Sequence, residues 1–175
     1  MIKLHVNIQK LQKFQKENGS IDAYYRQFID IEKDPTFQLL ITNLSKYGSK
    51  DKLAELGISL TAEYLRNVGY EMSKPDRHIC RILDAEHLGC LNLKVADATD
   101  TEIEKAKFEA MKIVDQITSK LIAKYKRQMS VAEVDYILWS YCADGYGETC
   151  TENKPKCKTC IATEFCIESS NGKKE

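Results

Sequence analysis

The chain has 175 residues, which is long enough to bury one sizeable core. Its 26 Lys and Arg residues balance 26 Asp and Glu residues, so overall charge excludes a strongly basic nucleic-acid-binding chain, and any such surface must come from local clusters. Hydrophobic residues make up 43% of the chain and charged residues 30%, with only 3 prolines, which excludes disordered and fibrous classes. No apolar run approaches the roughly 18 residues of a membrane helix, and lysines occupy the N-terminal stretch where a signal peptide is apolar. We therefore expect a cytoplasmic protein with no membrane partner.

Helix caps and helix breakers occur along the whole chain, and no segment alternates as a strand does, so we expect an all-α fold. A first helix is predicted over about 6–17, and Ser20 is the predicted N-cap of a second. Asp34 followed by Pro35 predicts the start of a third helix, because proline is favoured at the first helical position. That helix is expected to end at Gly48.

The middle of the chain predicts a helical hairpin followed by a capped helix. Residues 50–69 are interpreted as two short helices joined by a tight turn from Gly57 to Ser59, which makes a helix-hairpin-helix candidate. After a short connection, Asp76 is the predicted N-cap of the next helix.

Two capping boxes predict the last long helices. Thr101 and Glu104 are expected to open a long amphipathic helix that runs to about Arg127. Ser130 and Glu133 form the second box and open the helix that precedes the cysteine-rich segment. The predicted organisation is therefore a helical domain over 1–149, a cysteine loop over 150–168 and a polar tail over 169–175, without an evident linker.

Four cysteines near the C-terminus have the spacing of a metal centre. Cys150, Cys157, Cys160 and Cys166 follow the pattern C-x6-C-x2-C-x5-C, which one short loop can wrap around a compact centre. Zinc and a 4Fe-4S cluster both accept four thiolates, and the spacing alone leaves both open. A disulfide loop is disfavoured because cytoplasmic thiols stay reduced and the total of 7 cysteines is odd. The remaining cysteines are predicted to be ordinary small buried side chains: Cys80, Cys90 and Cys142.

The motifs around this loop carry a family resemblance. Its spacing, the KPKCKTC core and the preceding helix resemble the C-terminal iron-sulfur loop of endonuclease III type DNA glycosylases of the helix-hairpin-helix superfamily. Upstream, LAELGISLTAEYLRNVGY followed by KPDRHICRIL resembles the hairpin and aspartate motif of that superfamily and is similar to archaeal 8-oxoguanine DNA glycosylases. The resemblance covers about residues 50–168. It implies a helix-hairpin-helix glycosylase-like fold, a 4Fe-4S cluster rather than zinc on the four cysteines, double-stranded DNA as partner and a cytoplasmic, nucleoid-associated location.

The resemblance also implies a reaction and its residues. Asp76 stands at the position of the catalytic aspartate, where a carboxylate stabilises positive charge on the sugar as the base departs, whereas its alternative role is that of an N-cap only. Ser59 stands where strand-cleaving members carry a lysine, and a one-residue shift would place Leu60 there instead. Neither side chain can form a Schiff base, so the implied enzyme hydrolyses the N-glycosidic bond without cleaving the strand. Ser59 is alternatively the N-cap of its helix.

Two basic clusters and the hairpin are candidate DNA contacts. Lys154, Lys156 and Lys158 lie within the cysteine loop and are expected to meet backbone phosphates, as are Gly57 and Ser59 of the hairpin. The second cluster is KYKR, and a solvated face is the alternative interpretation of both clusters. The second cluster has these basic residues: Lys124, Lys126 and Arg127.

The chain departs from the family pattern in its hairpin and N-terminal part. LAELG replaces the usual L-P-G-V-G, so Gly57 remains and Glu55 adds negative charge where a phosphate would sit. About fifty residues precede the hairpin, roughly half the usual length, so part of the base pocket is expected to be missing or rebuilt. The alternative function is therefore a non-catalytic iron-sulfur DNA-binding protein or a reduced subunit of a larger assembly. His78 is predicted to be part of the helix after Asp76, and Trp139 is predicted to be core. The aromatic residues of the N-terminal part are also predicted to be core, with base-stacking surfaces as the alternative: Phe14, Tyr24, Tyr25, Phe28 and Phe37.

Overall fold

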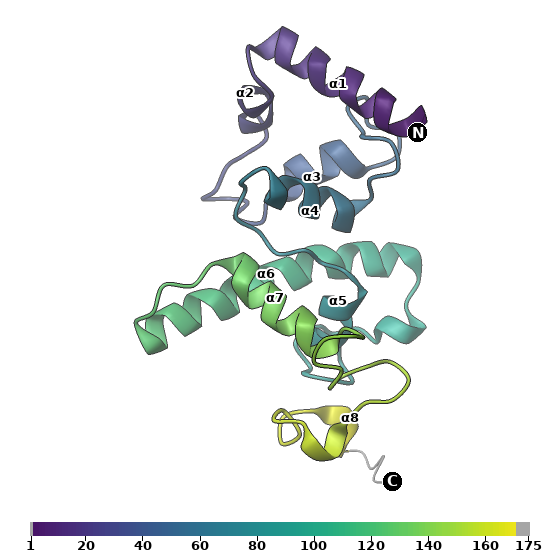
Figure 1. Ribbon diagram of the computed structural model, residues 1–175, viewed down its shortest axis with the longest axis vertical. Helices are drawn as coiled ribbons and strands as arrows, with labels where there is room; N and C mark the ends of the chain where they lie inside the picture. Colours follow the sequence, from purple (N-terminus) through teal and green to yellow (C-terminus); the bar gives the residue numbers. More distant parts are fainter. Residues whose placement is uncertain (1, 171–175) are drawn as a thin grey trace. The chain divides into compact units, whose positions relative to one another are not determined.

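The computed structural model describes residues 2–170, and every regular element in that range is helical (Figure 1). This confirms the all-α class. The chain divides into two compact units, residues 1–70 (unit 1) and residues 71–175 (unit 2), which are described separately. None of the helices within residues 2–170 combines the length and the apolar composition that crossing a lipid bilayer requires.

Unit 1 contains four helices. Ser20 caps the second helix as predicted, because its hydroxyl accepts a hydrogen bond from Ala23 N at 2.9 Å. The third and fourth helices pack against each other. The four helices are α1 (Ile2–Asn18), α2 (Ile21–Arg26), α3 (Gln38–Ser45) and α4 (Ile58–Asn67).

The predicted start of α3 is wrong. Asp34 and Pro35 lie in a turn, and the helix begins only at Gln38 after Phe37, whose backbone is left-handed with φ 56°. Asp34 still satisfies a helical amide, because its Oδ2 accepts from Leu39 N at 2.8 Å. The carboxylate therefore caps from five residues away rather than from the adjacent position.

The segment predicted as two short helices contains one. Residues 49–57 form turns, and α4 begins at Ile58, so Ile58 and Ser59 belong to the helix and not to the turn. Leu53 is buried in this connection, and its amide donates to Leu44 O at 2.8 Å. Because Leu53 and its backbone bond hold the connection against α3, a first hairpin helix is not needed to fix it.

The core of unit 1 is rich in aromatic side chains. Phe14 stacks on Tyr24 with ring centroids 4.0 Å apart, and Tyr25 OH lies 2.9 Å from Tyr64 OH. Of the five aromatic residues predicted to be core, all but Phe28 are buried, and Phe28 is half-buried. These rings therefore hold the short helices together.

Unit 2 is built on three packed helices and ends in the cysteine loop. Helices α5, α6 and α7 pack pairwise around one hydrophobic core. Cys80 and Cys142 are buried in that core as predicted, but Cys90 is exposed, because it follows the surface turn that ends α5. The elements are α5 (Arg77–Leu83), η1 (Val95–Asp97), α6 (Asp100–Tyr125), α7 (Val131–Cys142), η2 (Cys157–Thr159) and α8 (Ile167–Ser170).

The two long helices of unit 2 open with capping boxes. The box of α7 is the predicted one, with Glu133 N donating to Ser130 Oγ at 3.0 Å and Ser130 N donating to Glu133 Oε2 at 2.7 Å. The box of α6 is formed by Thr99 and Glu102, two residues before the predicted pair. Two overlapping matches to the same motif occur there, and the helix uses the first.

The beginning of unit 2 is tied to α7. Glu71 Oε1 accepts from Val131 N at 2.5 Å and from Ala132 N at 3.3 Å, so this carboxylate binds amides that the start of a helix leaves unpaired. Asp135, which is buried, accepts from Lys74 N at 2.9 Å. The extended segment before α5 is therefore fixed along α7.

Replacing Ser130 with Ala should lower the free energy of unfolding of unit 2 by about 1 kcal/mol, because an N-cap hydroxyl is lost. Trp139 is the single tryptophan of the chain and lies in α7, so its fluorescence during urea unfolding reports on this unit. Ser140→Ala is the matched control: its hydroxyl bonds only to Ile137 O within the same helix, and the change should be a few tenths of a kcal/mol. An equal effect of both substitutions would contradict the capping role.

Candidate functional site

The four spaced cysteines of unit 2 line one cavity. Cys150, Cys157, Cys160 and Cys166 are half-buried and form its wall together with other residues of the loop. Four thiols are suitable donors for either zinc or a 4Fe-4S cluster, so the donor chemistry fits both groups. In the part of the chain that the structure describes, no three His, Cys, Asp or Glu side chains converge tightly enough to bind a single metal ion.

The third cysteine is held by hydrogen bonds within the loop. Tyr141 OH lies 2.9 Å from Cys160 Sγ, and Ala162 N donates to the same sulfur at 3.4 Å. Burial and the neighbouring Cys160 raise the pKa of Tyr141 to about 12, so its phenol stays protonated at neutral pH and can donate to a thiolate. Thr163 Oγ1 donates to Cys160 O at 2.6 Å and fixes the following turn.

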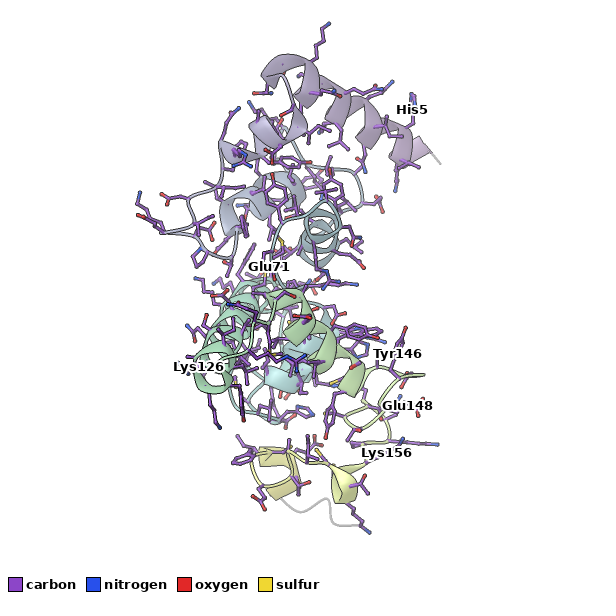
Figure 2. All side chains as sticks on the ribbon, turned by 60° about the vertical axis from the view of Figure 1, so that its left-hand side comes forward. His5, Glu71, Lys126, Tyr146, Glu148 and Lys156 are labelled. Carbon is purple, nitrogen blue, oxygen red and sulfur yellow. The ribbon has the colours of Figure 1, made fainter. Side chains whose placement is uncertain are left out.

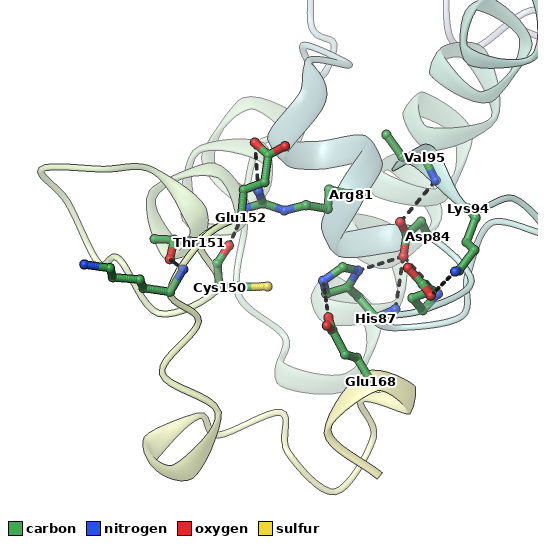
Figure 3. Close-up of polar contacts among 11 residues, drawn as sticks. Arg81, Asp84, His87, Lys94, Val95, Cys150, Thr151, Glu152 and Glu168 are labelled. Atoms are coloured by element: carbon green, nitrogen blue, oxygen red, sulfur yellow. Dashed lines mark hydrogen bonds and ion pairs between the residues drawn. The ribbon is translucent and has the colours of Figure 1, made fainter. Parts of the chain in front are cut away.

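The start of the cysteine loop is bound to α5 by Arg81, as Figure 3 shows. Its guanidinium donates to Cys150 O, and its Nη1 lies 3.9 Å from Glu152 Oε2. The Arg81 side chain is only 13% exposed, so its charge is largely withdrawn from water and this contact is strong.

The end of the loop is bound by His87. Its Nδ1 lies 2.7 Å from Asp84 Oδ1 and its Nε2 lies 3.1 Å from Glu168 Oε2, while Ile167 N donates to His87 O at 3.0 Å (Figure 3). Two hydrogen bonds raise the pKa of His87 to about 10, and the one with Asp84 has a larger effect than the one with Cys150. Burial would raise the pKa of Asp84, but the His87 bond and backbone amides bring it below the ordinary value. A buried ion pair thus closes the loop onto unit 2.

A fifth cysteine adjoins the four. The Cys142 thiol is hydrogen-bonded to Cys150, which together with Arg81 lowers the pKa of Cys142 although burial opposes this. The same hydrogen bond is the main cause that raises the pKa of Cys150, and burial is the second. The expectation that Cys142 is an ordinary buried residue therefore missed its neighbours. The sequence spacing does not predict these contacts of Cys142, because α7 ends at Cys142 and the loop begins only after a turn.

Asp76 is the N-cap of α5, as predicted. Its Oδ1 accepts from His78 N at 2.9 Å and from Ile79 N at 3.2 Å, and the residue is half-buried. Asp76 and Arg81 stand at opposite ends of the same short helix, so the aspartate motif and the cysteine loop share one unit. Both capping bonds use Asp76 Oδ1, so Oδ2 can accept a hydrogen bond from another donor.

The hairpin residues lie in unit 1. Gly57 is the N-cap of α4, which rules out the alternative that Ser59 is the N-cap, and Ser59 stands in the first turn, half-buried. Glu55 has a left-handed backbone with φ 63°, a conformation that glycine adopts without strain, so the backbone bends at the position where the family has glycine. Its carboxylate lies 2.6 Å from Lys3 Nζ, which offsets its negative charge.

The candidate DNA-contacting lysines are exposed but not equivalent. Lys154 lines a cavity with cationic residues of α5, whereas Lys156 Nζ lies 3.6 Å from Glu148 Oε2 (Figure 2). Lys158 lies in η2. In the second basic cluster, Lys126 is the C-cap of α6 with φ 55°. Of the three loop lysines, Lys154 is therefore the one that shares a cavity with Arg77 and Arg81.

Comparison with known proteins adds no relative. No protein-family model, no curated protein and no solved structure matches the chain.

Replacing Arg81 with Met should loosen the cysteine loop, because the bond to Cys150 O is lost while the aliphatic volume is kept. Trypsin should then cleave at the loop lysines several-fold faster, as followed by mass spectrometry of the intact protein. Arg77→Met is the matched control, since it removes an exposed arginine from the same helix. Equal cleavage rates in both variants would show that Arg81 does not hold the loop.

Proposed function

We propose that the protein is a monofunctional DNA glycosylase of base excision repair that hydrolyses the N-glycosidic bond of a damaged or mismatched base in double-stranded DNA. One observation carries the proposal. Unit 2 joins Asp76, at the start of α5, to four cysteines that line one cavity, and Arg81 of the same helix binds the first of them. These are the features in which the sequence resembles endonuclease III type glycosylases.

In this proposal Cys150, Cys157, Cys160 and Cys166 hold a 4Fe-4S cluster, with zinc as the alternative. The loop between them has little apolar core, since Ile161 is 88% exposed and Phe165 is 74% exposed. When bound, the cluster supplies iron-thiolate bonds that fix the loop in one conformation. Arg81 and His87 hold the two ends of the loop, so the loop lysines can face DNA phosphates.

The proposed chemistry centres on Asp76. Excision requires that the nucleotide leave the base stack and that positive charge on the sugar be stabilised as the base departs. The amides of His78 and Ile79 hold the Asp76 carboxylate in place, so it can stabilise that charge and orient an attacking water. Its remaining oxygen lone pairs accept the proton of that water.

The first turn of α4 supports hydrolysis without strand cleavage. Ser59 carries a hydroxyl at the position of the lyase lysine, and a hydroxyl cannot form an imine with the sugar. Glu55, on the other hand, favours the alternative function, a non-catalytic iron-sulfur DNA-binding protein or a reduced subunit of a larger assembly. Its carboxylate lies in the turn before α4 that would approach a phosphate, and although Lys3 offsets its charge, no glycine amide is available there as in L-P-G-V-G.

The cluster predicts a coloured protein. When the protein is purified without oxygen, we expect broad absorbance near 400 nm and about four iron atoms and four sulfide ions per chain. Cys157→Ser should lose most of this absorbance, because a ligand is removed. Cys90→Ser, which changes an exposed cysteine outside the four, should retain it. Stoichiometric zinc in a colourless protein would contradict the cluster.

Replacing Asp76 with Asn tests the reaction. Asn also caps helices, so α5 should persist, while base release should fall by at least about a hundredfold because the charge is lost. The measurement is single-turnover release from duplexes that carry uracil, 8-oxoguanine, thymine glycol, alkylated purines or A opposite 8-oxoguanine. Duplex binding by the variant should stay within about twofold, which shows that it is folded.

Two outcomes would contradict the proposal. Equal product from the wild-type protein and Asp76→Asn would remove Asp76 from the reaction. A covalent adduct after borohydride treatment would show that an amine attacks the sugar, and the enzyme would not be monofunctional.

A further inference from the structure

An aromatic surface lies at the end of α7. Trp139 is flanked by Tyr136, at a ring-centroid distance of 6.1 Å and an interplanar angle of 27°, and by Tyr146, at 4.7 Å and 67°. Tyr136 is 56% exposed and Tyr146 is 58% exposed, whereas Trp139 is half-buried. The prediction that Trp139 is core is therefore only partly met. Of the three rings, named here the stacking surface, Tyr136 and Tyr146 are exposed to solvent.

The stacking surface is built by a close backbone approach. Gly147 N donates to Ser140 O at 2.8 Å, and a Cβ on Gly147 would meet that oxygen at 2.8 Å. Only glycine allows the chain to fold back so tightly on the end of α7. This turn holds Tyr146 against Trp139, and Figure 2 shows Tyr146 at the edge of unit 2. The position of the Tyr146 ring is thus fixed before any partner binds.

A cationic cavity adjoins the stacking surface. It has a volume of about 410 Å³, and its lining includes Arg77, His78, Arg81 and Lys154. His78 connects the two features, because it lines the cavity and its ring meets Trp139 edge-on at 6.3 Å. Aromatic faces and positive charge therefore lie next to each other on one side of unit 2.

Two buried nitrogen atoms of residues that line this cavity have no hydrogen-bond partner within residues 2–170. They are His78 Nδ1 and Arg81 Nε. Buried polar atoms are nearly always paired, and the Arg81 Nε–H group can only donate, so this nitrogen is suited to an anionic ligand. Two carboxylates also line the cavity, Asp144 and Glu152, and Glu152 is 67% exposed. The cavity therefore suits one phosphate group rather than a long run of phosphates.

We propose that the stacking surface and the cationic cavity together bind one unpaired nucleotide of a DNA strand, with its base on the aromatic rings and its phosphate in the cavity. An unpaired base offers a free π face, whereas a base inside a duplex is covered by its neighbours. The phosphate diester complements Arg77, Arg81 and Lys154. The choice of DNA rests on the proposed function, but the stacking and the phosphate contact do not.

The single tryptophan makes the test direct. A single-stranded thymidine oligonucleotide of about 12 residues is titrated into the full-length protein while Trp139 emission is followed. Saturable quenching is expected. A duplex of the same length and a strand of abasic residues should bind at least about fivefold more weakly, because neither offers a free base. Anisotropy of a labelled oligonucleotide gives an independent affinity.

Four variants separate stacking from charge. Tyr146→Ala should weaken binding at least about fivefold, and Tyr146→Phe should keep it, because the ring remains. Lys154→Ala should weaken binding and reduce the slope against log salt concentration by about 0.7, as expected for one phosphate contact. Glu152→Gln should strengthen binding, because a carboxylate leaves the cavity. Tyr47→Ala, at a residue 93% exposed in unit 1, is the matched aromatic control and should have no effect.

Each outcome decides the inference. Absence of quenching, unchanged affinity of Tyr146→Ala, or equal binding of the abasic strand would overturn it, and equal binding of a uridine ribo-oligonucleotide would overturn the assignment to DNA. Asp76→Asn should bind the thymidine strand as the wild-type protein does. Strand binding without base release would therefore refute the proposed function alone, and base release without strand binding would refute this inference alone.

Discussion

The hydrogen bond from Arg81 to the carbonyl oxygen of Cys150 is the contact on which the candidate site depends. The cysteine loop buries little apolar surface, so its conformation must come from polar contacts and from whatever its thiols bind. Arg81 holds the first cysteine and His87 holds the end of the loop through Glu168. Two buried cations of unit 2 thus define where the loop starts and where it stops, and the cavity of four thiols lies between them.

This arrangement relates the electrostatics of unit 2 to its chemistry. A buried cation is unfavourable unless it is paired, and both cations are paired here: His87 with two carboxylates, Arg81 with a carbonyl and a distant Glu152. The pairing of Arg81 is the less complete, since its Nε has no hydrogen-bond partner among the described residues, and Arg81 also lines the cationic cavity. The same side chain therefore supports the thiol cavity on one side and leaves capacity for an anion on the other.

Local features could be predicted from the sequence, and long-range partners could not. The caps at Ser20, Asp76 and Ser130 were predictable because a cap bonds to amides two or three residues away. The start of α3 failed because Phe37 adopts a left-handed backbone, which no propensity signals. The box at Thr99 was missed because two overlapping motifs were equally good.

The cysteine spacing predicted that four thiols share one site, since a short loop brings them together, and the cluster itself remains a prediction. By contrast, Arg81 and Cys150 are 69 residues apart. Only tertiary structure pairs them.

Glu71, at the start of unit 2, also has a partner that is distant in the sequence. Its carboxylate accepts from the first amide of a helix that begins 60 residues later and so adds a long-range cap to the local capping box of α7. The boundary at Tyr70 and Glu71 is therefore chemical as well as spatial: a unit cut one residue later would lack the carboxylate that accepts from the amides of Val131 and Ala132.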